Sequence, residues 1–269
     1  MRFLERDGVR LAWNEQGSGP PILLIMGHRF SSRLWYSAFE SLGDRYRLIS
    51  FDNNGTGESG DRIPTSVRDM TDDALAVLDA AGVDSAHIYG VSMGGGIALD
   101  FGIRYPERTR SLILGCTMAK TPDIKRSPKW LMKLLYRLPP PVFRLLRKKK
   151  HKGGYGDAAP DEAIARDLKM AEGDRYSVEG VLAQALAITD YAVDPADVAA
   201  VKAPTLVLHG TQDGLVPYEQ GHRLAGMIPG ARLVTFQDVG HNYFVGAGER
   251  ANAEVDAFIR QVEAGRAGA

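Results

Sequence analysis

The chain has 269 residues, which is enough for one large domain with a substantial core. Lys and Arg together number 33, as do Asp and Glu, so the net charge is zero and gives no reason to expect nucleic acid as a partner. One cysteine, Cys116, cannot form an intrachain disulfide. The amino-terminal residues lack the apolar run of a secretion signal, and no stretch approaches the roughly 20 apolar residues that span a bilayer. These features predict a cytoplasmic protein without a transmembrane segment.

Short apolar runs alternate with helical patterns along the chain. The first sixteen residues predict a hairpin that turns at Asp7 and Gly8. Apolar runs of strand length follow at 21–27, 46–52, 85–91, 110–116, 203–210 and 231–238. Helical spacing is found at 66–82, 93–104, 218–227 and 248–263. Strands that are apolar throughout and separated by helices predict an α/β fold, in which helices cover both faces of a mostly parallel sheet. Such sheets bind ligands at the carboxyl ends of their strands.

Residues 120–195 interrupt this alternation with helical patterns and little strand signal. We expect them to form a helical insertion, a cap or lid over the carboxyl edge of the sheet, with 1–119 and 196–269 as the core. An independent helical domain is the alternative, but the strand pattern resumes soon afterwards. The stretch RLPPPVFRLLRKKKHKGG within this region is strongly basic. It is either a solvated helix end or a docking patch for an acyl-carrier protein, a coenzyme A ester or an acidic membrane surface.

Residues 90–94 read G-x-S-x-G between a predicted strand and a predicted helix. A serine on so sharp a turn has strained backbone angles, and side chains two residues before and after it would collide. In return, the hydroxyl of Ser92 is exposed at a helix N-terminus, where the amide of Met93 can stabilise an oxyanion. The alternative is a merely tight turn between strand and helix.

A serine hydroxyl needs a base, and His241 is the best-placed of six histidines. It follows the last predicted strand and precedes the last helix, in a loop at the expected carboxyl edge. His28 is the main rival. His209 ends a strand and is expected to pack against the turn that follows it. His87, His151 and His222 fall in a strand, a basic run and a helical pattern.

The histidine in turn needs a carboxylate that fixes its tautomer. Asp213 directly follows a buried strand, and the chain order serine, acid, histidine is the one found with this kind of strand–turn–helix serine. An aspartate before a glycine also commonly serves only a turn. Asp238 is the local rival, three residues before His241.

Four segments together resemble the α/β-hydrolase superfamily over nearly the whole chain: LLIMGHRFSSRLW (23–35), FDNNGTGES (51–59), GVSMGG (90–95) with HGTQDGLVP (209–217), and VGHN (239–242). The resemblance implies an eight-stranded sheet, a lid after the sixth strand and a triad of Ser92, Asp213 and His241. It also implies that the second oxyanion amide is that of His28. That residue follows Met26-Gly27, where the family commonly has His-Gly.

Two kinds of cofactor site are not expected. Residues 55–60 read G-x-G-x-x-G, but no helix opens there, which argues against a dinucleotide such as NAD or FAD. Cys116 and the scattered histidines lack metal-ligand spacing, so the sequence predicts no metal.

The sequence therefore predicts a carboxylic-ester hydrolase or lactonase that acts on a small or medium apolar acyl group. Gly27, Phe30, Trp35, Met118 and Tyr243 are the expected substrate-binding residues, although each is equally compatible with the core. Thioester hydrolysis, carbon–carbon bond hydrolysis, perhydrolysis and a slow or non-catalytic receptor remain alternatives on the same fold.

Overall fold

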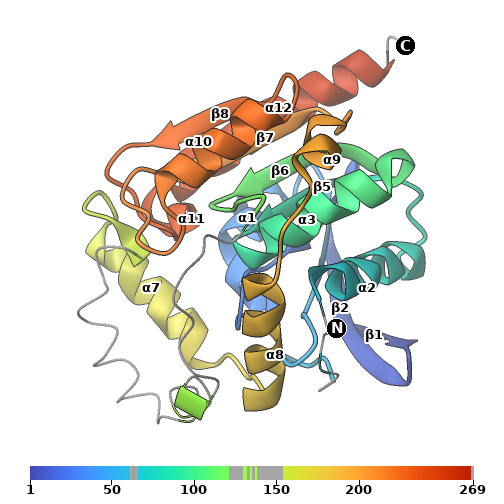
Figure 1. Ribbon diagram of the computed structural model, residues 1–269, viewed down its shortest axis with the longest axis vertical. Coiled ribbons are helices and arrows are strands. Elements are labelled where there is room, and N and C mark those ends of the chain that lie inside the picture. Colours follow the sequence, from blue (N-terminus) through green and yellow to red (C-terminus); the bar gives the residue numbers. More distant parts are fainter. Residues whose placement is uncertain are drawn as a thin grey trace.

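An eight-stranded sheet forms the centre of the molecule in the computed structural model, which describes residues 1–60, 63, 66–120, 130–131, 134, 137 and 154–267 (Figure 1). The strands are β1 (Arg2–Arg6), β2 (Val9–Gln16), β3 (Pro21–Ile25), β4 (Arg47–Phe51), β5 (Ala86–Val91), β6 (Thr109–Gly115), β7 (Thr205–Gly210) and β8 (Arg232–Phe236). Their order across the sheet is β1-β2-β4-β3-β5-β6-β7-β8. Strands β3 to β8 pair in parallel, and β1 and β2 add an antiparallel hairpin at one edge. The predicted mostly parallel eight-stranded sheet is confirmed.

Helices cover both faces of the sheet. They are α1 (Tyr36–Leu42), α2 (Val67–Ala80), α3 (Met93–Arg104), α7 (Asp161–Glu172), α8 (Val178–Thr189), α9 (Pro195–Ala199), α10 (Tyr218–Met227), α11 (Tyr243–Gly246) and α12 (Gly248–Ala267), with short 3₁₀ turns η1 (Ser32–Trp35) and η2 (Pro106–Arg108). Strand β3 shows why the strands read as continuously apolar. Leu23 and Ile25 join the core beneath α2 and α3, whereas Ile22 and Leu24 join the core beneath α1 and α12. Both faces of the strand are therefore buried.

Most predicted elements agree with the structure within two residues at each end. The hairpin turns at Asp7 and Gly8, both in the left-handed region with φ of 53° and 74°. The helix predicted at 93–104 has those bounds. Strand β3 ends at Ile25, two residues before the predicted end, so Met26 and Gly27 leave the sheet and begin a loop.

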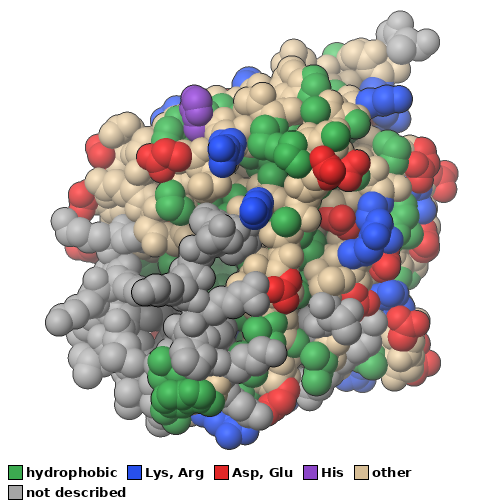
Figure 2. Space-filling model, in the orientation of Figure 1, with side chains coloured by type: hydrophobic (Ala, Val, Ile, Leu, Met, Phe, Trp, Pro, Cys, Tyr) green, Lys and Arg blue, Asp and Glu red, His purple; other side chains and the backbone are tan. Residues whose placement is uncertain are grey.

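Helices α7 and α8 belong to the chain between β6 and β7, and Figure 1 shows α7 on one side of the molecule and α8 nearer to α2. Helix α7 packs against η1 and α11, and α8 packs against α2. The basic run predicted as a docking patch spans 137–154, of which residues 138–153 are outside the described part of the chain, so the docking patch stays a prediction. Acidic and basic side chains intermingle on the described surface in Figure 2, as expected for a chain of zero net charge. Among the described helices, none is long and apolar enough to cross a membrane.

Candidate active site

Ser92 lies at the apex of the turn between β5 and α3. Its φ of 57° and ψ of −119° are a combination that L residues rarely adopt. The Ser92 amide donates a hydrogen bond to the carbonyl of Gly115 at 2.8 Å, and the Ser92 carbonyl accepts one from Thr117 Oγ1 at 2.8 Å. Contacts to the end of β6 thus hold the strained turn. The serine is partly exposed at the N-terminus of α3, in the conformation that the motif predicted.

The two glycines of the motif are required by close backbone packing. A Cβ at Gly90 would lie 2.0 Å from the carbonyl oxygen of Gly94, and a Cβ at Gly94 would lie 2.0 Å from the carbonyl oxygen of Ile25. Neither approach is sterically possible. The sequence at these positions therefore allows α3 to begin directly against β3 and β5, which fixes the amide of Met93 beside Ser92.

Asp213 and His241 meet beyond the carboxyl ends of β7 and β8. His241 Nδ1 donates to Asp213 Oδ2 at 2.7 Å, and both side chains are almost fully buried. Asp213 Oδ1 accepts from the amides of Leu215 and Val216, each at 2.8 Å. Because Nδ1 carries the proton that bonds Asp213, Nε2 of His241 is left to accept a proton. That is the tautomer a general base needs.

A second imidazole also contacts Asp213. His209 Nε2 lies 3.3 Å from Asp213 Oδ2 and 2.9 Å from the carbonyl oxygen of Val216. Burial alone would raise the pKa of Asp213, but hydrogen bonds from His209 and His241 outweigh it and hold that pKa below its usual value. The carboxylate therefore stays ionised beside His241. His209 packs against the following turn as predicted, but its contact with Asp213 was not foreseen, although the i,i+4 spacing could have indicated it.

The loop after β3 brings Gly27 and His28 to the same place. A Cβ at Gly27 would lie 3.2 Å from Cβ of Ser92 and 3.9 Å from its Oγ, so this backbone approaches the hydroxyl directly. His28 Nε2 donates to the carbonyl of Val181 on α8 at 2.8 Å. Two more contacts hold the loop, from the Arg29 amide to Gln184 Oε1 at 3.0 Å and from the Ser31 amide to Asp174 Oδ2 at 2.8 Å.

A cavity of about 550 Å³ opens beside these residues. Ser92, Met93, His28 and His241 all line it. Its wall is largely apolar, and includes Phe30, Val67, Met118, Ile188, Leu215 and Phe244. The structure thus gathers the predicted hydroxyl, the imidazole and both residues of the predicted oxyanion amides around one apolar pocket.

The predicted substrate-binding residues divide into two groups. Gly27, Phe30 and Met118 line the pocket. For Trp35 and Tyr243 the structure corrects the expectation, because both are buried in the core beneath α1 and α12 rather than on the pocket wall. The Tyr243 ring stacks on Phe236, and its hydroxyl lies 2.8 Å from that of Tyr89.

Sequence reasoning missed a neighbouring residue, Phe244, which lines the pocket while Tyr243 points inward. Both belong to the short helix α11, where consecutive side chains point about 100° apart. Val67, Ile188 and Leu215 were also missed. Of these, Leu215 could have been predicted to line a pocket, since it is a large apolar residue in a polar turn of the sequence. In the structure it is 56% exposed.

The rival residues have other roles. Burial lowers the pKa of His28 to about 4, and its Nε2 proton is directed at Val181. Asp238 is exposed and pairs with Gln212 and Gln237 instead of His241. The glycines at 55–60 lie in a turn between β4 and α2, and α2 begins only at Val67, so no helix opens within them.

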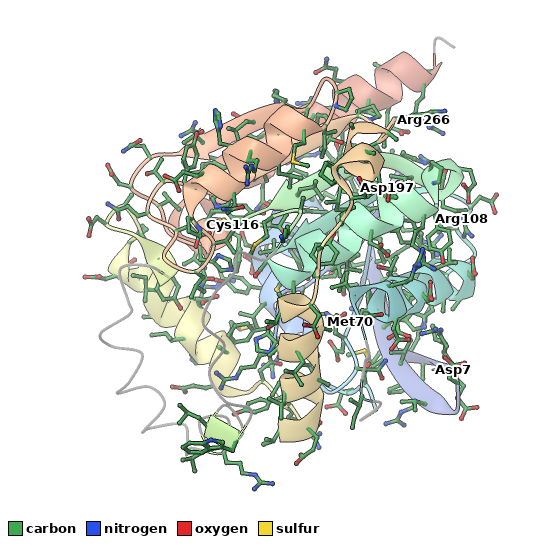
Figure 3. All side chains as sticks on the ribbon, in the orientation of Figure 1. Asp7, Met70, Arg108, Cys116, Asp197 and Arg266 are labelled. Carbon is green, nitrogen blue, oxygen red and sulfur yellow. The ribbon has the colours of Figure 1, made fainter. Side chains whose placement is uncertain are left out.

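The fold does bring Cys116 close to His209 and Asp213, with their ligand atoms within 4.8 Å of one another. The spacing of Cys116 and the histidines in the sequence did not indicate this proximity. Figure 3 marks Cys116 in the interior of the molecule. Burial and the charge of Asp213 raise the pKa of its thiol, and His209 Nε2 carries a proton toward Val216.

The sequence matches the family described as the alpha/beta hydrolase fold over residues 20–247. The chain belongs to this family. Several of its relatives are named as hydrolases, and others as non-heme bromoperoxidases. The 2-hydroxy-6-oxo-6-phenylhexa-2,4-dienoate hydrolase of Comamonas testosteroni is 30% identical over 241 residues, which cover 85% of this chain and 84% of that protein. "Putative carbamate hydrolase RutD" of Azorhizobium caulinodans is 38% identical over 115 residues, and this match spans only 43% of its length.

The fold is also that of solved family members. A thermophilic esterase from Thermogutta terrifontis superposes with a TM-score of 0.83 at 27% identity, covering 97% of this chain and 99% of the esterase. Both the family and the eight-stranded architecture predicted from the sequence are thereby confirmed.

Proposed function

We propose that this protein is a serine hydrolase that cleaves a carboxylic ester or lactone of a small or medium apolar acyl group. The observation that carries the proposal is the arrangement at the pocket. A serine on a strained turn shares an apolar cavity with an imidazole, and the other ring nitrogen of that imidazole donates to a buried carboxylate. This combination supplies a nucleophile, a base and a fixed tautomer.

In the first half of the reaction, Ser92 Oγ attacks the substrate carbonyl and His241 Nε2 accepts the hydroxyl proton. The carbonyl π-electrons move to oxygen, which becomes an oxyanion between the backbone amides of Met93 and His28. Collapse of this intermediate breaks the bond to the leaving group, which takes the proton from His241. An acyl-enzyme on Ser92 remains.

In the second half, His241 removes a proton from water, and the resulting oxygen nucleophile attacks the acyl carbonyl. The same two amides receive the charge. Collapse releases the acid, and the proton returns from His241 to Ser92 Oγ. Asp213 stays ionised throughout and stabilises the imidazolium, because its pKa lies below the ordinary value.

We further propose that residues 120–195 act as a cap. Their described part supplies Gly154, Ile188, Thr189 and Tyr191 to the pocket lining. Helix α8 also accepts the hydrogen bond from His28 and contacts the amide of Arg29 through Gln184. The cap therefore both lines the pocket and holds the loop that carries one of the two oxyanion amides.

Carbon–carbon bond hydrolysis of a vinylogous diketone acid is the second candidate. It is favoured by the 30% identity to a relative named as a 2-hydroxy-6-oxo-6-phenylhexa-2,4-dienoate hydrolase. The same nucleophile and base would serve, with a carbanion in place of an alkoxide as leaving group. Esters rank first because the pocket wall is largely apolar, which suits an uncharged acyl group better than a substrate that carries a carboxylate.

The test combines labelling with turnover. A fluorophosphonate probe should label wild-type protein at Ser92, and Ser92→Ala should abolish labelling. On a panel of p-nitrophenyl esters, lactones, thioesters and diketones, Ser92→Ala should lower kcat/KM for the best substrate about 10⁴-fold or more. Ser18→Ala is a matched control, because Ser18 is exposed on the loop between β2 and β3 and is not among the described residues that line the pocket.

The outcomes separate the candidates. Turnover of esters or lactones well above the other classes supports the proposal. Labelling of Ser92 with turnover of diketones alone would transfer the assignment to carbon–carbon hydrolysis. A folded protein in which Ser92 resists the probe would indicate a receptor built on this fold.

A further inference from the structure

We propose that His209 is a positioning residue, a second imidazole that holds the Asp213 carboxylate in the orientation His241 requires. This inference rests on the proposed function, because it assigns a role in the same triad. Asp213 Oδ1 is fixed by two backbone amides, whereas Oδ2 is shared between His241 at 2.7 Å and His209 at 3.3 Å. His209 is therefore the only described imidazole besides His241 within salt-bridge distance of this carboxylate.

The contacts of His209 determine its tautomer. Its Nε2 faces two acceptors, the carbonyl oxygen of Val216 at 2.9 Å and Asp213 Oδ2. An acceptor pair of this kind requires a proton on Nε2. The other ring nitrogen, Nδ1, is buried and has no hydrogen-bond partner among the residues that the structure describes. His209 is consequently a donor toward Asp213 and not a second base.

Packing holds the ring of His209 in this position. Its side chain is fully buried, and its ring meets Tyr218 edge-on with centroids 5.9 Å apart. One turn further along α10, a Cβ at Gly221 would lie 2.1 Å from Nδ1. Helix α10 therefore packs directly against the His209 ring and holds it near the turn that carries Asp213. Only glycine at position 221 leaves room for the ring.

This arrangement has a catalytic consequence that packing alone would not have. A donor shared at Oδ2 draws negative charge away from the oxygen that faces His241, and it opposes rotation of the carboxylate. Without His209 the charge at Oδ2 would be more concentrated, and the His241 imidazolium would be better stabilised. The acid limb of the pH dependence of kcat/KM, where the base becomes protonated, would then move to higher pH. KM should change little, because His209 is not among the described residues that line the pocket.

The experiment compares His209→Met, which removes the donor at similar volume, with His209→Gln, whose amide can still donate near the position of Nε2. We expect H209M to lower kcat about 10-fold with KM within about twofold, and to move the acid limb upward by about half a pH unit. H209Q should recover most of both effects. His222→Met on the exposed side of α10 is the matched control and should behave as wild type. The low-field proton signal of the His241–Asp213 hydrogen bond should shift in H209M alone.

Gly221→Ala tests the same contact without changing a polar group. Its Cβ would displace the ring of His209, so the variant should reproduce the kcat loss and the shifted acid limb. Gly226→Ala, on the same helix with open space at its Cβ, is the control. If H209M proves unfolded, G221A decides the question, since it keeps the imidazole of His209 and changes only the position of the ring.

Different results would overturn the proposed function and the role of His209. If Ser92→Ala retains wild-type turnover, the proposed function fails. If Ser92→Ala is inactive but folded H209M or G221A keeps the wild-type kcat and acid limb, then the role of His209 is structural and this inference alone fails. Loss of activity in H209M that H209Q does not recover, with the acid limb unmoved, would also overturn it.

Discussion

The two sides of the proposed oxyanion site are held in place by different means. On one side, Met93 follows the turn at Ser92, and its position is fixed by backbone contacts of neighbouring strands and by glycines packed against backbone oxygens. On the other side, the loop that carries His28 is anchored by groups 143 to 155 positions away in the chain, between β6 and β7. One amide is thus placed by local geometry and the other by a distant segment.

This difference indicates that the loop at His28 can change position more easily than the turn at Ser92. The turn at Ser92 cannot shift without disrupting β3, β5 and β6, so it is suited to hold a strained nucleophile. The position of the loop at His28 depends on α8, because Val181 and Gln184 contact the loop directly. Changes in α8 should therefore alter catalysis through one amide while the nucleophile stays in place.

Among the variants that test this difference between the turn and the loop, Gly94→Ala should have the largest effect. The added Cβ would meet the carbonyl oxygen of Ile25 at 2.0 Å, so either α3 or β3 must shift. We expect a loss of about 3 kcal/mol in the free energy of unfolding and a fall in kcat/KM of about 100-fold or more. Urea unfolding and steady-state kinetics on the best ester measure the two quantities.

Gly226→Ala on α10 is the control for added volume, since nothing lies within 4 Å of its Cβ. It should be neutral or more stable by up to about 1 kcal/mol, as expected for alanine in a helix. If Gly94→Ala kept wild-type stability and turnover, the turn would be far more adaptable than its contacts indicate.

The loop is tested by Gln184→Leu. Gln184 is fully buried, and its side chain accepts from the Arg29 amide and donates to the carbonyl of Asn54 at 2.8 Å. Leucine would leave both backbone groups without this partner, so we expect a loss of about 2 kcal/mol in unfolding free energy. Because the loop next to His28 is released, kcat/KM should fall about 10-fold while fluorophosphonate still labels Ser92.

Gln261→Leu, on an exposed position of α12, should change stability by no more than about 0.5 kcal/mol. The informative comparison for Gln184→Leu is between the loss of stability and the loss of kcat/KM. A destabilised Gln184→Leu variant with undiminished kcat/KM would mean that α8 supports the fold without setting the geometry of the loop.

The same contrast explains what the sequence could predict. The turn at Ser92 is encoded by adjacent residues. The glycines at 90 and 94 are needed because a Cβ at either position would collide with backbone, and the G-x-S-x-G pattern indicates this in the sequence. The pairing of Asp213 with His241 could be predicted because the two residues follow β7 and β8, neighbouring parallel strands whose carboxyl ends lie at the same edge of the sheet. Strand ends converge there whatever the details of the loops.

Contacts made by segments of irregular sequence were not predictable in this way. Nothing in the pattern around Gln184 indicated that its amide would reach Arg29 and Asn54 across 130 or more positions. Trp35 and Tyr243 were wrongly predicted to bind substrate. Both follow segments that lead to the carboxyl edge of the sheet, but this position in the sequence does not determine which way a side chain points. Both turned inward to fill the core. Tertiary packing, rather than local propensity, decided these positions.

The smallest expected effect is the loss of stability at acid pH, to which His28 in the loop and His87 in β5 both contribute. Burial lowers the pKa of His28 to about 4 and that of His87, within β5, to about 3. Both rings ionise near pH 6.5 in the unfolded chain. Because both folded-state values are lowered, their stability contribution is complete above about pH 6.5 and is lost as the pH falls toward 4. At pH 5.5 each ring should account for about 1 kcal/mol of lost stability relative to pH 8.

Chemical denaturation between pH 8 and pH 4.5 measures this slope, and His28→Gln and His87→Gln should each reduce it by up to one proton's worth, about 1.4 kcal/mol per pH unit. The comparison with pH 8 in the same variant removes any loss of packing. Only His28→Gln should also lower kcat/KM, since His28 contacts α8 and lines the pocket, whereas His87 is bonded to Ser111 near the far end of its strand. If His87→Gln impaired turnover as strongly as His28→Gln, the loop would have lost its special dependence on α8, and the division between a locally fixed turn and a remotely held loop would have to be abandoned.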